Sequence, residues 1–277
     1  IGSFLNVLIL RYDERRSLFS IRPLLGRSRC PRCGNRLAWH ELIPFVSFLI
    51  QRGKCRSCRK PISIQYPVVE LLAGLIVATV PAYVADMFVQ FAPAAPAWLP
   101  PAAAAAWIGI FLLLLCITVI DIRKRIIPDE AVAGVALLAC AAVAAKYALV
   151  PFASFIGPYA ALFGLQERII LGSAAGTLFG TVLFGALIIA TRGRGMGMGD
   201  MKLAAAIGFA LGWPDGAIAL LLSFMAGTLF FLPFLAMRAM GAKNAVPFGP
   251  FMAVAAGIVF FFGDTLARGY IALFGII

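Results

Sequence analysis

The sequence predicts an all-α polytopic membrane protein of about eight transmembrane helices, with a small cytoplasmic domain between helices one and two. The chain of 277 residues is 62% apolar and only 13% charged. A soluble globular domain is nearer half apolar and a quarter charged. Several apolar runs reach the roughly 20 residues that cross a bilayer as a helix. Because backbone polar groups cannot go unpaired in lipid, we expect these spans to be helices.

The basic residues predict the orientation of these helices. The chain carries 24 Lys and Arg against 12 Asp and Glu, a net charge of +12. If it crosses eight times, all basic residues except Lys146, Arg168 and Arg268 fall on one side, which the positive-inside rule assigns to the cytoplasm. We therefore interpret the charge as topology, with attraction to anionic lipid headgroups as a second effect. We expect no nucleic-acid partner.

Three regions follow from this pattern. Residues 1–10 are too short to span and are expected to end a first transmembrane helix whose start precedes them. Residues 11–65 form a basic, cysteine-bearing cytoplasmic domain, and residues 66–277 form the transmembrane domain. Within it we expect helices at 67–90, 102–120, 128–150, 167–191, 200–212, 217–237 and 250–277.

The helix expected at 200–212 is unusually short. Thirteen residues cover only about 20 Å, against a hydrocarbon core of about 30 Å. Either the bilayer thins there or water reaches the start of this helix. A thin, wet cytoplasmic rim is what proteolysis inside a membrane would require.

Two Cys-x-x-Cys pairs, Cys30/Cys33 and Cys55/Cys58, lie 21 residues apart in the cytoplasmic region. Four cysteines at this spacing predict a tetrahedral zinc site. A redox dithiol and two disulfides are the alternatives, although a cytoplasmic location disfavours disulfides. Zinc would also stabilise a segment too short to fold around a core of its own.

We expect the remaining cysteines and the histidine to have no catalytic or metal-binding role. We expect Cys116 and Cys140 to be small buried side chains within apolar helices. His40, the only histidine, is expected to be structural or solvated. A single histidine makes a Ser-His-Asp triad improbable and excludes a histidine-rich zinc protease.

Two aspartates stand where predicted helices meet the cytoplasmic rim. Asp121 follows an apolar run, and Asp200 follows the glycine-rich segment 193–199. Ionisable residues at such positions are functional candidates. Two carboxylates close together share a proton, so one can act as base on a water and the other as acid toward a peptide carbonyl. Asp121 and Asp200 are therefore predicted to be catalytic, with no cofactor needed for proteolysis.

Simpler roles remain open for each aspartate. Asp121 could end its helix or pair with Arg125. Asp200 could be only the N-cap of the short helix, where Asp is favoured. A glycine-rich run with no preceding strand makes a dinucleotide fold improbable.

At these residues the chain resembles the type IV prepilin peptidases, the bifunctional leader peptidase/N-methyltransferases. The first catalytic motif matches Asp121 with Ile127-Pro128-Asp129, and the GxGD signature shared with presenilin-like and preflagellin peptidases matches 197–202. The resemblance covers nearly the whole chain; its other motifs lie at residues 2–7, at Cys30/Cys33, at 39–44, at 52–55 with Cys58, and at 66–71.

The resemblance implies a specific pair of reactions. Such enzymes cleave the basic leader of type IV prepilins or pseudopilins after a glycine, on the cytoplasmic face of the bacterial inner membrane. They then methylate the new N-terminus with S-adenosylmethionine, an activity associated with the four-cysteine domain. The sequence itself shows no methyl-donor site.

Two further residues have open roles. Glu70 could meet the substrate's positive leader or new amine, or it could favour the start of its helix through the dipole. Lys202 could tune the aspartates or, as we slightly favour, extend to the lipid headgroups.

Two other functions compete with proteolysis. A transporter would need acidic residues spread across the bilayer depth, whereas Asp121 and Asp200 are expected at one face. A zinc-stabilised scaffold of a pilus or secretion system would work without either aspartate.

Overall fold

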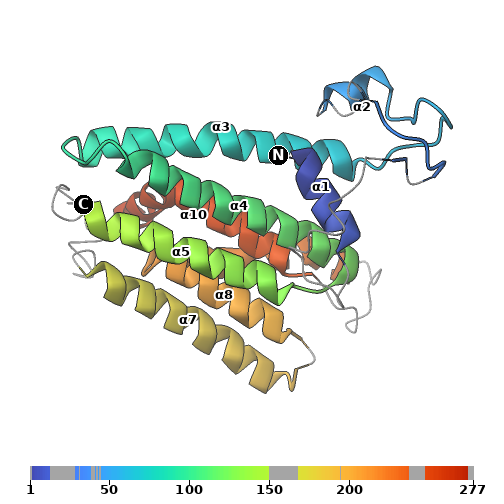
Figure 1. The fold of residues 1–277 in the computed structure, drawn as a ribbon. Helices are drawn as coiled ribbons and strands as arrows, with labels where there is room; N and C mark the ends of the chain where they lie inside the picture. Colours follow the sequence, from blue (N-terminus) through green and yellow to red (C-terminus); the bar gives the residue numbers. More distant parts are fainter. Residues whose placement is uncertain are drawn as a thin grey trace. The chain divides into compact units, whose positions relative to one another are not determined.

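The computed structural model is mostly helical (Figure 1). It describes residues 2–12, 29–30, 32–38, 41, 43, 45–149, 168–193, 195–236 and 247–273. Within these ranges there are two isolated bridges but no strand. The helices are α1 (Gly2–Arg11), α2 (Val46–Ile50), α3 (Gln65–Phe91), α4 (Leu99–Lys124), α5 (Asp129–Leu149), α7 (Ile169–Ala190), α8 (Met198–Leu211), α9 (Asp215–Ala236) and α10 (Gly249–Leu273).

Six of these helices are long and apolar enough to cross a membrane, namely α3, α4, α5, α7, α9 and α10. This confirms the expected helical membrane architecture. α8 has only 14 residues, as the sequence indicated, and α1 has 10. Both are shorter than a span, so the total of about eight transmembrane helices stays a prediction.

The described chain forms two compact units, residues 1–79 and residues 80–277. The first holds α1, the cysteine pairs and the start of α3. The second holds the helical bundle. The boundary expected after residue 65 coincides with the start of α3, and the division between the two units, after residue 79, falls within this helix.

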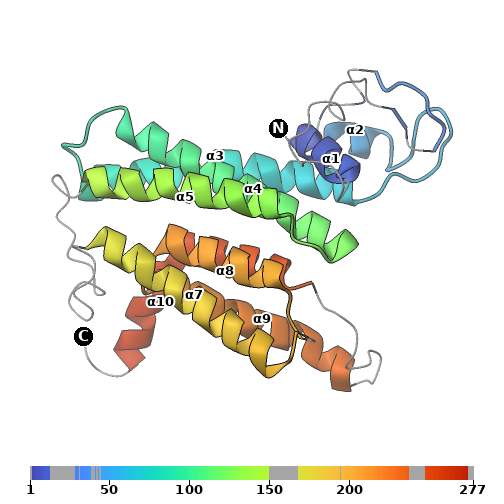
Figure 2. The ribbon, with the colours of Figure 1, turned by 60° about the horizontal axis from the view of Figure 1, so that its bottom comes forward.

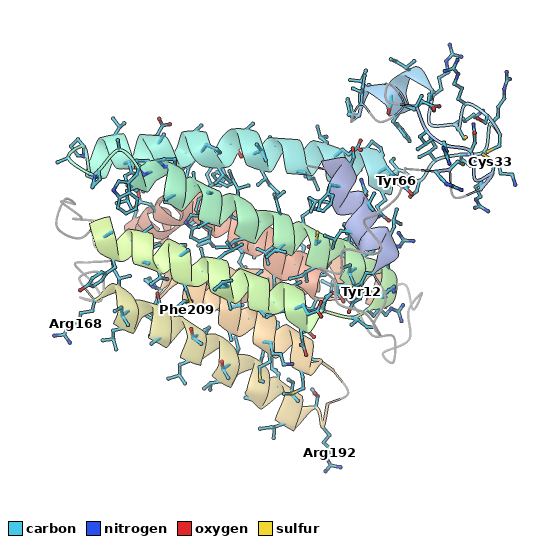
Figure 3. The ribbon with its side chains drawn as sticks, viewed as in Figure 1. Tyr12, Cys33, Tyr66, Arg168, Arg192 and Phe209 are labelled. Atoms are coloured by element: carbon cyan, nitrogen blue, oxygen red, sulfur yellow. The ribbon has the colours of Figure 1, made fainter. Side chains whose placement is uncertain are left out.

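In the second unit, α5 and α10 each pack against both α4 and α8. The α4–α5 and α7–α8 junctions lie at one end of this bundle, and the α8–α9 junction lies at the other (Figures 1 and 2). Arg168 and Arg192 mark the two ends of α7 (Figure 3). We call the end that holds residues 121–129, residues 191–193 and 195–202, and the start of α10 the aspartate end.

Helices α7 and α8 approach each other closely through small residues. A Cβ on Gly176 would collide with the carbonyl oxygen of Gly208, and a Cβ on Gly180 would lie 2.8 Å from the carbonyl oxygen of Ala204. Without a hydrophobic driving force in lipid, such close backbone packing is a principal source of helix association. The seam therefore fixes α8, which carries Asp200, along the length of α7.

Two helix ends differ from the expected positions. α4 continues past Ile120 to Lys124, because Arg125 is the residue that adopts the left-handed conformation, with φ 57° and ψ 41°, and ends the helix. α8 begins at Met198 rather than at Asp200, with Gly197 as its N-cap. Asp121 thus lies inside α4, and Asp200 is the third residue of α8.

Candidate active site and cysteine cluster

Asp121 lies in the last turn of α4 and is almost completely buried, with 4% of its surface exposed. Its Oδ2 accepts a hydrogen bond of 2.9 Å from the backbone N–H of Gly249, the first residue of α10. Arg125 meets Asp121 through the backbone, by donating its N–H to the Asp121 carbonyl oxygen. The carboxylate is therefore held by α10, and the suggested pairing with Arg125 is replaced by this contact.

Gly249 is a site residue that sequence reasoning missed. A Cβ at this position would lie 2.8 Å from Asp121 Oδ2, so the contact requires glycine. Pro250, in the first turn of an apolar run, marks the start of this helix, but nothing in the sequence pairs that start with Asp121. The first N–H groups of a helix have no partner within it, and Asp121 supplies one.

Asp200 is half-buried and stands at the start of its own helix. Its Oδ2 accepts a hydrogen bond of 3.0 Å from the N–H of Gly197. The Asp200 N–H in turn donates to the Gly197 carbonyl oxygen. Asp200 therefore helps to cap α8 from the third helical position. The N-cap itself is Gly197, not Asp200 as considered above. Asp200 Oδ1 takes no part in this contact.

Both aspartates belong to the aspartate end of the bundle, Asp121 on α4 and Asp200 on α8. The contacts that join α8 to the α4–α5 junction lie beside them. A Cβ on Gly199 would lie 3.0 Å from Cβ of Ile127, so these two segments approach closely. The two sequence motifs, 121–129 and 197–202, are thus brought together in space.

Lys202 forms an ion pair with Asp129, with 2.8 Å between Nζ and Oδ1. The side chains are 46% and 70% exposed, and a pair in this setting contributes at most about 1 kcal/mol. Lys202 thus joins the second motif to the first, and its contact with lipid headgroups stays a prediction.

In the first unit, the sulfur atoms of Cys30, Cys33, Cys55 and Cys58 all lie within 4.8 Å of one another. Four thiolates converging in this way fit a tetrahedral metal ion, with metal–sulfur distances of about 2.3 Å for zinc. Figure 3 labels Cys33, a member of this group of four. We call these residues the cysteine cluster.

The two halves of the cysteine cluster have the same local structure. Residues 29 and 36 form one isolated bridge, and residues 54 and 61 form the other, so each encloses a Cys-x-x-Cys pair at the same offset. The N–H of Gly34 donates to the Cys30 carbonyl oxygen, and the N–H of Arg59 donates to that of Cys55. Gly34 and Arg59 both have positive φ, 71° and 55°. The paired turns direct all four sulfurs to one point.

The thiols of the cysteine cluster differ in acidity. Burial raises the pKa of Cys30, but backbone hydrogen bonds from Arg32 and Cys33 and the neighbouring thiols outweigh it and lower the pKa to about 7. A backbone hydrogen bond from Asn35 lowers the pKa of Cys33, but desolvation and the Cys30 thiol raise it to about 11. One thiolate is therefore favoured at the expense of its neighbour, as expected for sulfurs close enough to share a cation.

Comparison with known proteins places these two units in one family. Residues 1–84 match the model of the bacterial Peptidase A24 N-terminal domain, and residues 107–232 match that of the type IV leader peptidase family. The prepilin leader peptidase/N-methyltransferase of Aeromonas salmonicida (strain A449) is 32% identical over 98% of this chain and 90% of its own length. The chain belongs to the type IV leader peptidase family.

Other members of this family show the same extent of similarity. The prepilin leader peptidase/N-methyltransferase of Pseudomonas aeruginosa is 30% identical, with 99% of this chain and 91% of the relative aligned. That of Xanthomonas campestris pv. campestris is 29% identical over 100% of this chain and 92% of the relative. No solved structure matches significantly. The expected family membership is thereby confirmed.

Glu70 in this leader peptidase is the sixth residue of α3, beyond the first turn. The helix dipole acts mainly within that turn, so it does not account for Glu70. Instead Oε1 accepts a hydrogen bond of 2.6 Å from the Ser3 hydroxyl, and Oε2 accepts one of 2.9 Å from the N–H of Phe45. Glu70 thus joins α1 and the segment before α2 to α3.

The other cysteines of the leader peptidase have different environments. Cys116 is 1% exposed, as expected for a small core side chain. Cys140 is exposed, so the expectation that it is buried was wrong. Apolar periodicity is weak in a helix that is apolar on all faces, and the sequence of α5 therefore does not distinguish its buried face from its exposed face. Trp39 and His40 lie outside the described residues.

The contact between Gly249 and Asp121 yields a direct prediction. Gly249→Ala introduces a Cβ 2.8 Å from Asp121 Oδ2 and displaces the carboxylate. A displacement of about 1 Å in a catalytic group can reduce rate about 100-fold, so we expect a loss of roughly this size in peptide cleavage. The matched control is Gly257→Ala in the same helix, where the nearest atom is Phe111 Cε1 at 3.9 Å. Equal activity in the two variants would contradict the placement of Asp121.

Proposed function

We propose that this chain cleaves the basic leader of type IV prepilins or pseudopilins after a glycine, using Asp121 and Asp200 as its catalytic pair. One observation carries the proposal. Two carboxylates at the same end of the bundle each accept one backbone N–H from a glycine, Gly249 or Gly197. Membership in the leader peptidase family supports the reaction, and the relatives' names support the substrate class.

The chemistry follows from the unequal environments of the two carboxylates. Asp121 is 4% exposed, while Asp200 is half-buried. In both, Oδ2 is the oxygen held by the glycine, so Oδ1 is the oxygen that would meet a water or the scissile carbonyl. With one proton shared by the pair, the ionised carboxylate takes a proton from the water as it attacks. The protonated one donates toward the peptide oxygen, and proteolysis needs no cofactor.

The reaction takes place on the cytoplasmic side of the bacterial inner membrane in this proposal. Positive charge gathers at the aspartate end, which includes Arg123, Lys124, Arg125, Arg192 and Lys202. Lys146 and Arg168 lie toward the other ends of α5 and α7. This distribution supports the orientation through the positive-inside rule. The same basic residues would attract anionic lipid headgroups.

A second reaction, methylation of the new N-terminus with S-adenosylmethionine, is part of the proposal. It is supported by the names of the relatives and by the N-terminal family domain that covers residues 1–84. We assign no residue to the methyl donor. The cysteine cluster would hold zinc through Cys30, Cys33, Cys55 and Cys58, and zinc there would stabilise the short segment that carries the four thiolates.

Cleavage of a purified prepilin tests the catalytic pair. Asp121→Asn and Asp200→Asn each remove one ionisable carboxylate with little change in shape, so we expect each to lose at least about 1,000-fold in rate. Glu130→Gln is the matched control, because Glu130 lies at the same end, is exposed and belongs to neither motif. It should stay within about threefold of wild type. Near-normal cleavage by either catalytic variant would support a scaffold or transporter instead.

Substitution in the cysteine cluster tests the separation of the two reactions. Cys55 is 5% exposed and is one of four converging thiols, so Cys55→Ser should release the metal and unfold the surrounding segment. We expect methylation to fall at least about tenfold while cleavage changes less than about threefold, and metal analysis should find zinc only in the wild type. Equal loss of both reactions would instead indicate a purely structural cluster, and a wild type without zinc would refute the metal assignment.

A further inference from the structure

Two sequence motifs that contain neither Asp121 nor Asp200 pack against each other in the first unit. They are residues 2–7 in α1 and residues 66–71 in α3. A Cβ on Gly2 would lie 2.6 Å from Cα of Glu70, so the two backbones are nearly in contact there. Figure 3 marks Tyr66 at the start of α3, beside α1. We call this contact the α1–α3 crossing.

Glu70 brings a negative charge to the α1–α3 crossing. Its carboxylate accepts hydrogen bonds from the Ser3 hydroxyl and the Phe45 N–H, and both donors are neutral. Neither contact therefore compensates the charge. Each carboxylate oxygen can accept a second hydrogen bond. The half-buried carboxylate is thus suited to a further donor, and a cationic one would form the strongest bond.

Asn6 brings an unused acceptor to the same crossing. Its side chain is 1% exposed, and its Nδ2 donates to the Tyr66 carbonyl oxygen at 3.2 Å. Its Oδ1 is buried with no hydrogen-bond partner within the described residues. A buried acceptor without a partner is unfavourable and calls for an explanation.

The spacing places both acceptors at neighbouring turns of the α1–α3 crossing. Ser3 and Asn6 lie one turn apart on α1, and Tyr66 and Glu70 lie one turn apart on α3, so each pair shares a helix face. The bonds Ser3–Glu70 and Asn6–Tyr66 therefore join the same two faces at adjacent turns. The crossing offers one negative charge and one free amide oxygen in a largely buried setting.

A protonated primary amine matches this set of acceptors. It carries one positive charge and three N–H donors on a small head, whereas an anion would be repelled. A calcium ion would require six to eight oxygen ligands, more than these two side chains provide. We propose that the α1–α3 crossing binds the free amino terminus of a polypeptide through the Glu70 carboxylate and Asn6 Oδ1.

This inference rests on the proposed function, which supplies such an amino terminus. Cleavage after the leader frees one primary amine on the mature substrate, and methylation must hold that amine in place. The site lies in the first unit, which also carries the cysteine cluster. Asn6 and Glu70 are binding residues for the methyl acceptor, distinct from the aspartates that cleave the peptide.

Peptide binding to the full chain in detergent tests the site directly. The probes are two fluorescent peptides with the first residues of the mature substrate, one with a free N-terminal amine and one N-acetylated. Wild type should bind the free amine at least about tenfold more tightly, as expected for a charge-assisted hydrogen bond. Asn6→Leu and Glu70→Gln should reduce this preference to within about twofold, and Asn6→Asp, which adds a negative charge, should increase it.

Ser3→Ala is the matched control, because it removes a neutral donor from Glu70 and leaves both acceptors in place. It should keep the amine preference. Cleavage of prepilin by every variant, within about threefold of wild type, verifies that each is folded. An Asn6→Leu variant that cleaves normally and still prefers the free amine would overturn the inference.

Mass spectrometry of the mature product distinguishes this inference from the proposed function. If wild type cleaves but adds no methyl group, the proposed methyl transfer fails, whatever the peptides show. If wild type methylates and both Asn6→Leu and Glu70→Gln methylate at the same rate and with the same KM for the amine, the site alone is wrong. We expect both variants to raise the KM for the amine at least about tenfold.

Discussion

The hydrogen bond from Gly249 N–H to Asp121 Oδ2 satisfies a donor and an acceptor that would otherwise lack partners. The first N–H groups of a helix have no partner within that helix, and a buried carboxylate needs donors. Leaving either group buried without a hydrogen-bond partner would cost free energy. Placing the carboxylate of α4 at the start of α10 satisfies both, and the positive end of the helix dipole favours the negative charge. The absence of a Cβ at Gly249 makes the contact possible.

Asp200 repeats this arrangement within its own helix. It accepts the N–H of Gly197 while standing in the first turn of α8. Glycines at Gly176 and Gly180 hold α8 against α7, and Lys202 with Asp129 joins α8 to the start of α5. Each aspartate is thus fixed through one oxygen by a glycine N–H, and the helices that carry them are joined through α5 and α10. This is the preorganisation that a pair of catalytic carboxylates needs.

The sequence was sufficient to single out candidate groups but not their partners. Asp121, Asp200 and the four cysteines could be singled out as candidates because ionisable residues are rare in apolar helices and paired Cys-x-x-Cys spacing is specific. Gly249 could not, because its contact with Asp121 spans 128 residues and depends on how helices pack. The sequence also did not predict that Cys140 is exposed, because a helix that is apolar on every face does not indicate which side is buried. Glu70 was noticed, but its hydrogen bonds to Ser3 and Phe45 required coordinates.

The proposed catalysis depends on one juxtaposition, that of residues 121 and 200 at one end of the bundle. Cross-linking measures it directly. Asp121→Cys and Asp200→Cys are combined in a chain with Cys116→Ala and Cys140→Ala, treated with a short bismaleimide, and analysed by mass spectrometry of the peptides. We predict a 121–200 cross-link, and none when Asp121→Cys is combined with Asp215→Cys, because Asp215 begins α9 at the opposite end. A 121–215 cross-link without a 121–200 cross-link would contradict the account.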